Sequence, residues 1–80
     1  MKILIADDHA IVRKGLANIL KDEFTELELG EASNSIDTIN KSRKIYWDLI
    51  LLDISMPGRS GLETLKQMRE DGIKAPILML

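Results

Sequence analysis

The sequence predicts an α/β domain with a doubly wound parallel sheet. Three short runs, 2–6, 49–52 and 76–80, are dominated by apolar residues. Such runs are typical of strands that are buried on both faces, as in the centre of a parallel sheet. Segments with helical spacing separate the strands, and this alternation predicts parallel strands joined by right-handed crossovers.

A further strand is predicted over residues 26–32, where charged and apolar residues alternate. Alternation is the pattern of a strand with one exposed face. Charged side chains also discourage pairing with other chains, so we place this strand at an edge of the sheet. The aromatic pair Tyr46 and Trp47, just before the 49–52 strand, is predicted to cover part of the core.

A segment whose apolar residues recur at helical intervals follows the first strand, and another follows the edge strand. One face of the first helix carries four apolar residues, Val12, Leu16, Ile19 and Leu20. Gly15 lies in the same helix, either to let it pack closely on the sheet or with little consequence. The second helix has a thinner apolar face, comprising Ile36, Ile39 and Ile45, with Thr38 and Ser42 between them. Ser33 or Ser35 can cap its first turn.

The segment after the 49–52 strand begins with a predicted turn and continues as a helix. Pro57 and Gly58 suit the central positions of a type II turn, because proline presets φ and glycine accepts a positive φ. Ser60 and Glu63 have the spacing of a capping box, and Gly72 is the expected end of the helix. The predicted buried stripe comprises Leu62, Leu65 and Met68.

Acidic residues are predicted to meet at one end of this sheet. With the alternating strand at an edge, the spatial order of the strands, numbered along the chain, is 2-1-3-4. In that order the chain moves toward one edge from the first strand and toward the other edge from the third strand. The gap between these two strands is the switch point, where ligands of open parallel sheets bind. Asp7 and Asp8 follow the first strand, and Asp53 follows the third.

Three neighbouring carboxylates need a proton or a cation. Two carboxylates about 5 Å apart repel by about 3 kcal/mol at an effective dielectric constant of about 20. Because the predicted ligands are oxygen atoms, Mg²⁺ or Mn²⁺ is favoured over zinc. Asp53 could then act as a nucleophile toward a phosphoryl group. A strand-end cap and a solvated acidic rim are the alternatives.

Composition and missing motifs exclude several functions. The chain has 80 residues, a formal net charge of −2 and no cysteine, so there is no disulfide framework, no thiol nucleophile and no overall attraction to nucleic acid. The apolar runs are too short to span a membrane, and the absence of cysteine fits the cytoplasm. Neither glycine-rich nucleotide fingerprint is present.

Two other strand-end sites fit less well. A flavin phosphate would be repelled by Asp7 and Asp8. A phosphatase of the haloacid-dehalogenase type would carry a second acid where this chain has Ser55. We interpret His9, the single histidine, as a loop residue and not as a ligand.

Taken together, these motifs resemble the receiver domain of two-component response regulators. The matching segments are residues 5–9, 51–62 and 76–80. The sequence Glu31-Ala32-Ser33 is most similar to the branch that is fused to a LuxR-type helix-turn-helix domain. The resemblance covers the whole chain and implies the flavodoxin-like form of the doubly wound sheet, incomplete after the fourth strand.

The resemblance also implies a role for each residue of the acidic site. Asp53 would accept a phosphoryl group from the phosphohistidine of a sensor histidine kinase. Asp8, Asp53 and the backbone carbonyl of Ser55 would bind Mg²⁺ directly, and Asp7 would act through water. The family functions as a switch, so we expect no enzyme activity beyond slow hydrolysis of its own aspartyl phosphate.

The match to the receiver pattern stops at the end of the chain. Residues 1–80 correspond to the N-terminal two-thirds of a receiver domain, and the family's phosphoryl-sensing Ser or Thr and its paired Lys would follow Leu80. We expect a truncated receiver from a DNA-binding transcription regulator, with DNA contacted only through a domain absent here. One hypothesis is a phosphoacceptor that binds Mg²⁺. The other is an interaction unit that self-associates through the 76–80 strand, or by exchange of elements, without phosphotransfer.

Overall fold

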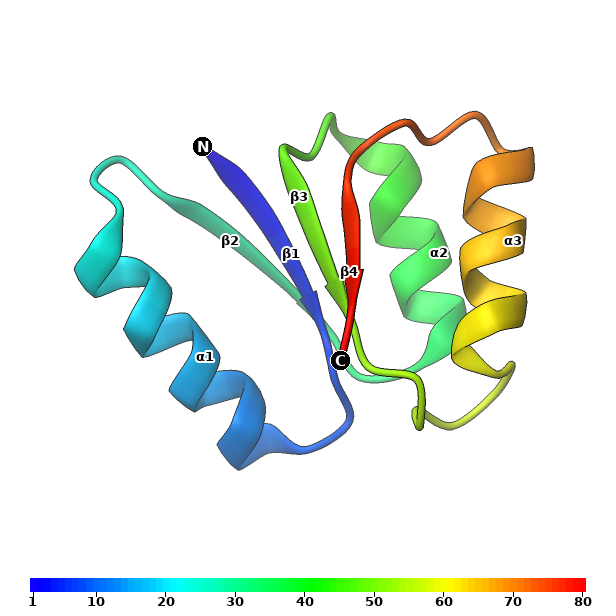
Figure 1. The fold of residues 1–80 in the computed structure, drawn as a ribbon, viewed down its shortest axis with the longest axis horizontal. Helices are drawn as coiled ribbons and strands as arrows, with labels where there is room; N and C mark the ends of the chain where they lie inside the picture. Colours follow the sequence, from blue (N-terminus) through cyan, green and yellow to red (C-terminus); the bar gives the residue numbers. More distant parts are fainter.

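A computed structural model describes all 80 residues, Met1–Leu80, as one parallel sheet of four strands between two layers of helices (Figure 1). The strands are β1 (Lys2–Ala6), β2 (Glu28–Ala32), β3 (Leu49–Leu52) and β4 (Ile77–Met79). The helices are α1 (Ala10–Glu23), α2 (Ser35–Lys44) and α3 (Gly61–Glu70). Helix α1 lies on one face of the sheet, and α2 and α3 lie on the other. None of these helices has the length and apolar character needed to cross a membrane.

The strand order is β2-β1-β3-β4, and all neighbouring strands are parallel. This confirms the predicted order, with the alternating strand at one edge. Ala6 of β1 pairs with Leu52 of β3, so the next residues, Asp7 and Asp53, leave the sheet side by side. The Asp53 N–H donates to the Ala6 carbonyl at 2.9 Å, which fixes this register up to the end of the strands.

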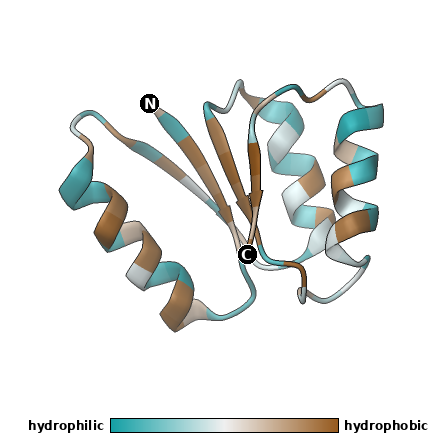
Figure 2. Cartoon of the chain, viewed as in Figure 1, coloured by the Kyte–Doolittle hydropathy of each residue, from teal (hydrophilic) through white to brown (hydrophobic).

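The central strands β1 and β3 are buried on both faces, as predicted, whereas β4, for which the same was predicted, lies at an edge with Leu78 55% exposed. Alternate residues of a strand point to opposite faces. On the α1 side, the buried residues are Ile3, Ile5, Ala17 and Leu51. On the other side, the larger core includes Leu4, Ala6, Ile50, Leu52 and Met68. The hydropathy colouring in Figure 2 shows apolar residues along most of β1, β3 and β4, and both polar and apolar residues along the helices.

The predicted stripe of helix α1 is partly correct: Leu16 and Leu20 pack against the core, whereas Val12 and Ile19 do not. Val12 and Ile19 are 48% and 61% exposed, whereas Ala17 is buried. Ala17 lies in the buried face of the helix together with Leu16 and Leu20, and Val12 and Ile19 are exposed to solvent. No atom lies within 4 Å of the position that a Gly15 side chain would occupy, so this glycine does not serve close packing on the sheet.

Helix α2 also differs from the prediction, in its cap and in its buried face. Asn34 is the cap, and its Oδ1 accepts a hydrogen bond from the Asp37 N–H at 2.8 Å. Ile36 is 66% exposed, although it was predicted to be buried. The buried residues of α2 are Ser35, Thr38, Ile39 and Ser42. Hydroxyl side chains are tolerated there because each has a hydrogen-bond partner: Thr38 Oγ1 donates to the Asn34 carbonyl at 2.7 Å, Ser42 Oγ donates to the Ile39 carbonyl at 2.7 Å, and Ser35 Oγ accepts from the Arg59 N–H.

Helix α3 begins and ends where the sequence predicts. Ser60 Oγ accepts from the Glu63 N–H at 3.2 Å, and Gly72 has a positive φ of 83° just after the helix. The predicted stripe is correct for the buried Met68 but wrong for Leu62, which is 71% exposed. Helix α3 is also joined to α2: the Arg43 guanidinium binds the carboxylate of Asp71 and holds the pKa of that carboxyl below its usual range.

Candidate functional site

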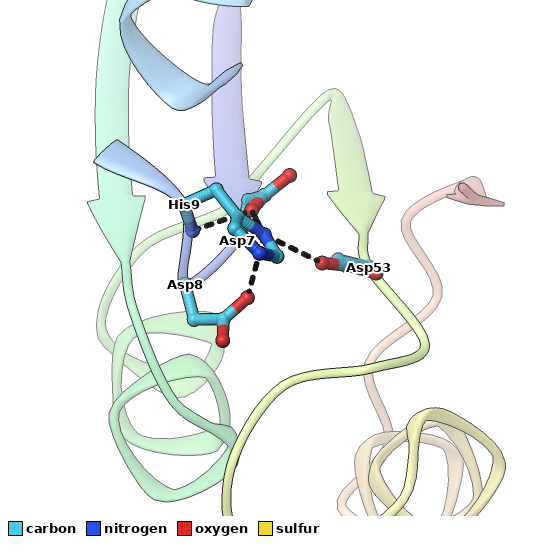
Figure 3. A group of neighbouring side chains, drawn as sticks. All are labelled: Asp7, Asp8, His9 and Asp53. Atoms are coloured by element: carbon cyan, nitrogen blue, oxygen red, sulfur yellow. Dashed lines mark hydrogen bonds and ion pairs between the residues drawn. The ribbon is translucent and has the colours of Figure 1, made fainter. Parts of the chain in front are cut away.

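The carboxyl ends of β1 and β3 hold the group of acidic residues that the sequence predicts. Asp7, Asp8 and Asp53 lie together with His9, and one ligand atom from each lies within 4.8 Å of the others (Figure 3). The Asp7 side chain is 5% exposed, that of Asp53 13% and that of Asp8 26%. The site is therefore a partly buried cluster of side chains, Asp7, Asp8, His9 and Asp53, which is called the acidic pocket below.

His9 occupies the middle of this pocket, which the sequence analysis did not predict. Its Nδ1 lies 3.2 Å from Asp7 Oδ1, 3.0 Å from Asp8 Oδ1 and 3.9 Å from Asp53 Oδ2. His9 is a loop residue, as interpreted from the sequence, but it is not isolated, because the turn after β1 brings its ring close to the three carboxylates. The His9 N–H donates to Asp7 Oδ1 at 2.7 Å and holds that turn.

Arg13 supports the same turn from helix α1. One guanidinium nitrogen donates to the Asp7 carbonyl at 2.6 Å, and Nε donates to Glu31 of β2 at 2.8 Å. The guanidinium thus fixes the chain at Asp7 against the edge strand. It also brings a positive charge near the acidic pocket.

Asp53 is oriented by the residue two positions further on. The backbone N–H and the Oγ of Ser55 both donate to Asp53 Oδ1 at 3.0 Å. With Oδ1 held in this way, Oδ2 is the oxygen that faces His9. Ser55 therefore contacts the acidic site through Asp53, and the binding of a cation by its backbone carbonyl remains a prediction.

The loop after Asp53 is attached to the start of α2 by Ser35, which is fully buried. Ser35 Oγ accepts from the Arg59 N–H at 2.8 Å, and the Ser35 N–H donates to the Pro57 carbonyl at 3.2 Å. Gly58 has a positive φ of 97°, as the predicted turn requires, and a side chain there would lie 2.2 Å from Ser35 Oγ. Ser35 and Gly58 thus fix the shape of this loop together.

We expect Ser35→Ala to destabilise the protein by about 1–3 kcal/mol, because it leaves the part-buried Arg59 N–H without its acceptor. Chemical denaturation measures the free energy of unfolding, and hydrogen exchange at the Arg59 amide reports the loop directly. Ser33→Ala is the matched control, since Ser33 is exposed. Equal unfolding free energies for the two variants would show that the attachment through Ser35 is unimportant.

The pocket fits a divalent cation. Asp8 Oδ1 is buried and has no hydrogen-bond partner, although His9 Nδ1 is 3.0 Å away. An unpaired buried carboxylate oxygen is unfavourable, and three carboxylates in one pocket repel one another. Oxygen ligands of this kind suit Mg²⁺ or Mn²⁺.

A doubly wound parallel sheet with an acidic pocket at its switch point defines the class of flavodoxin-like α/β domains that carry a strand-end carboxylate site. Residues 3–80 match the family described as the response regulator receiver domain. The match covers nearly the whole chain, and the chain belongs to this family. The resemblance drawn from the sequence is thereby confirmed.

Similar proteins and similar solved structures support the assignment to this family. The nitrate/nitrite response regulator protein NarP of Escherichia coli (strain K12) is 35% identical over 79 residues, 99% of this chain and 37% of NarP. A LuxR-family two-component response regulator from Aurantimonas sp. SI85-9A1 is 26% identical, with a TM-score of 0.87 over 98% of this chain and 56% of that one. The complex of histidine kinase ThkA with response regulator TrrA gives 35% identity and a TM-score of 0.82, over 98% of this chain and 66% of the matched one. The chain thus spans little more than a third of NarP.

Proposed function

We propose that this chain is a phosphoacceptor domain, in which Asp53 accepts a phosphoryl group from the phosphohistidine of a sensor histidine kinase. The observation that carries the proposal is the position of Asp53, whose carboxylate lies beside Asp7 and Asp8 at the switch point of the sheet. The solved complex of ThkA with TrrA supports a histidine kinase as partner.

In the proposed site, Asp8, Asp53 and the backbone carbonyl of Ser55 bind Mg²⁺, or Mn²⁺, directly and Asp7 acts through water. When bound, the cation would neutralise charge on the phosphoryl oxygens. Asp7 suits an indirect role, because its Oδ1 already accepts the His9 N–H at 2.7 Å.

The proposed transfer forms an acyl phosphate on Asp53. A carboxylate oxygen attacks the phosphorus, and the bond between the phosphorus and the imidazole nitrogen of the donor breaks. Both donors of Ser55 orient the carboxylate by holding Oδ1. Hydrolysis by water later restores Asp53, and we propose that this chain acts as a switch with only slow self-dephosphorylation.

We further propose that the switch serves a DNA-binding transcription regulator in the cytoplasm. NarP is named as a response regulator, and the Aurantimonas relative as one of the LuxR family. Contact with DNA would belong to a part of such a protein outside these 80 residues, because the acidic and basic residues of this chain nearly balance.

Incubation with acetyl phosphate and Mg²⁺ tests the proposal, because acetyl phosphate can stand in for the kinase. We expect slow, Mg²⁺-dependent addition of one phosphoryl group in intact mass spectra. Asp53→Asn should abolish the addition, whereas Asp22→Asn, which changes an exposed carboxylate of α1, should leave it unchanged. Labelling that survives Asp53→Asn would assign the acceptor to another residue.

A second candidate function is self-association, favoured by the exposed strand β4. Only β3 pairs with β4, so its outer edge is free. Leu78 and Leu80 are 55% and 47% exposed, and Figure 1 shows α1 near β1 and β2, away from β4. An apolar edge without charged residues recruits other strands.

For this second candidate we expect a dimer or a larger assembly at high micromolar concentration, joined through β4 or by exchange of elements. Light scattering coupled to gel filtration measures the mass. Leu78→Lys should convert the assembly to a monomer, whereas Leu62→Lys, at another exposed leucine on α3, should not. A monomeric mass for the unchanged protein would exclude this function.

A further inference from the structure

The ring of His9 is directed into the acidic pocket although most of its surface is exposed. Its side chain is 64% exposed, yet Nδ1 lies 3.0–3.2 Å from carboxylate oxygens of Asp7 and Asp8 (Figure 3). The N–H of the same residue donates to Asp7 Oδ1, so backbone and ring converge on one carboxylate. The position of the ring is therefore set by the turn after β1.

Two of the neighbouring atoms lie close enough together to bind one cation. Nδ1 lies 3.0 Å from Asp8 Oδ1, so both atoms can contact the same ion. Asp8 Oδ1 has no hydrogen-bond partner, which leaves it available to that cation. Asp53 Oδ2 lies 3.9 Å from Nδ1. Asp7 Oδ1, 3.2 Å from Nδ1, accepts the backbone N–H of His9 and keeps its proposed role through water.

We propose that His9 Nδ1 binds the cation directly and gives this site a preference for transition metals over Mg²⁺. The inference rests on the proposed cation site and adds a nitrogen ligand to its oxygen atoms. Imidazole suits metals such as Ni²⁺ and Zn²⁺, whereas carboxylates and carbonyls suit Mg²⁺ and Mn²⁺. A neutral imidazole with the proton on Nε2 offers Nδ1 as the ligand atom.

Electron spin echo spectroscopy of bound Mn²⁺ tests this contact directly, because it detects nitrogen nuclei bound to the metal. The protein contains one histidine, so an imidazole signal from tag-free protein has a single source. We expect a directly bound ¹⁴N signal in the unchanged protein and its loss in His9→Asn. The double variant His9→Asn, Asn18→His keeps one imidazole, on the exposed side of α1, and should also lack the signal.

Competition between Ni²⁺ and Mg²⁺ provides a second test. The side-chain oxygen of asparagine reaches about as far as Nδ1 of histidine, so His9→Asn replaces nitrogen by oxygen. We expect the preference for Ni²⁺ over Mg²⁺ to fall by about tenfold or more in His9→Asn, with the Mg²⁺ affinity nearly unchanged. Isothermal titration measures both affinities, and far-ultraviolet circular dichroism checks that the variant is folded.

Two results would overturn the inference: no ¹⁴N signal in the unchanged protein, or an unchanged Ni²⁺ to Mg²⁺ ratio in His9→Asn. Either result would mean that His9 acts only as a hydrogen-bonding neighbour of Asp7. Phosphorylation of Asp53 in Mg²⁺ would be unaffected by that outcome, so the proposed function would stand. Failure of every divalent cation to bind would exclude the inference and the proposed cation site together.

Discussion

Replacing Trp47 by alanine should destabilise the protein by about 3–5 kcal/mol. Trp47 is 7% exposed, and its ring fills the space over Gly30, where a side chain would lie 2.3 Å from the ring. Its Nε1 also donates to the Lys41 carbonyl at 3.0 Å. The loss is a large fraction of the total stability of an 80-residue domain, about 4–12 kcal/mol, so we expect unfolding at a much lower urea concentration.

Tyr46→Ala is the matched control, because Tyr46 precedes Trp47 and is 78% exposed. Surface substitutions of this kind change stability by about 0.5 kcal/mol or less. Urea denaturation followed by circular dichroism measures both variants. Equal midpoints for the two would show that the packing of Trp47 on Gly30 is not a main source of stability.

Mg²⁺ should stabilise the folded protein by about 2.7 kcal/mol at about 100 times its dissociation constant. For a domain of this size that corresponds to a rise in melting temperature of roughly 10–20 °C. The physical reason is that the cation neutralises Asp7, Asp8 and Asp53 in the folded state only. Asp8→Ala should abolish the response, and Asp22→Asn should retain it.

Asp53→Asn should have opposite effects with and without the cation. Without Mg²⁺ the variant should melt at a higher temperature, because one of three repelling charges is removed while the amide oxygen can still accept from Ser55. With Mg²⁺ it should gain less than the unchanged protein. A variant that melts lower without Mg²⁺ would indicate that the Asp53 carboxylate is a structural cap, and an unchanged protein that ignores millimolar Mg²⁺ would exclude the cation site.

The strands and their order could be predicted because a buried parallel strand needs apolar residues on both faces. The runs that became β1 and β3 meet that condition, and the alternating run that became β2 does not. The alternating strand, β2, was therefore assigned to an edge of the sheet, because it could not be buried on both faces. Asp7, Asp8 and Asp53 were predicted together because each follows a strand whose carboxyl end lies at the switch point.

The buried faces of the helices were predicted less well, because they depend on side-chain size and on local hydrogen bonds as well as on apolar spacing. The small Ala17 is part of the buried face of α1. The hydroxyls of Thr38 and Ser42 donate to nearby backbone carbonyls, which allows α2 to bury polar residues. As a result, Val12 and Ile36 are exposed.

The remaining parts of the site were not accessible from the sequence pattern. His9 approaches the carboxylates because of the geometry of the turn after β1. Ser35, at the start of α2, binds the backbone of Arg59, which lies 24 positions later in the chain. The sequence pattern placed His9 in a matching segment and Ser35 at a possible helix cap, but it could not show that either side chain reaches the loops of the site. One local hint for His9 was its place directly after two strand-end acids.

The position of the phosphoryl group tests the central claim most directly. After incubation with acetyl phosphate and Mg²⁺, borohydride reduces an acyl phosphate to an alcohol, and tandem mass spectrometry of the peptides identifies the modified residue. We predict that Asp53 alone is converted and that chelation of Mg²⁺ prevents the conversion. Conversion of Asp7 or Asp8 instead, or no conversion after prolonged incubation with Mg²⁺, would contradict the assignment of Asp53 as the phosphoacceptor.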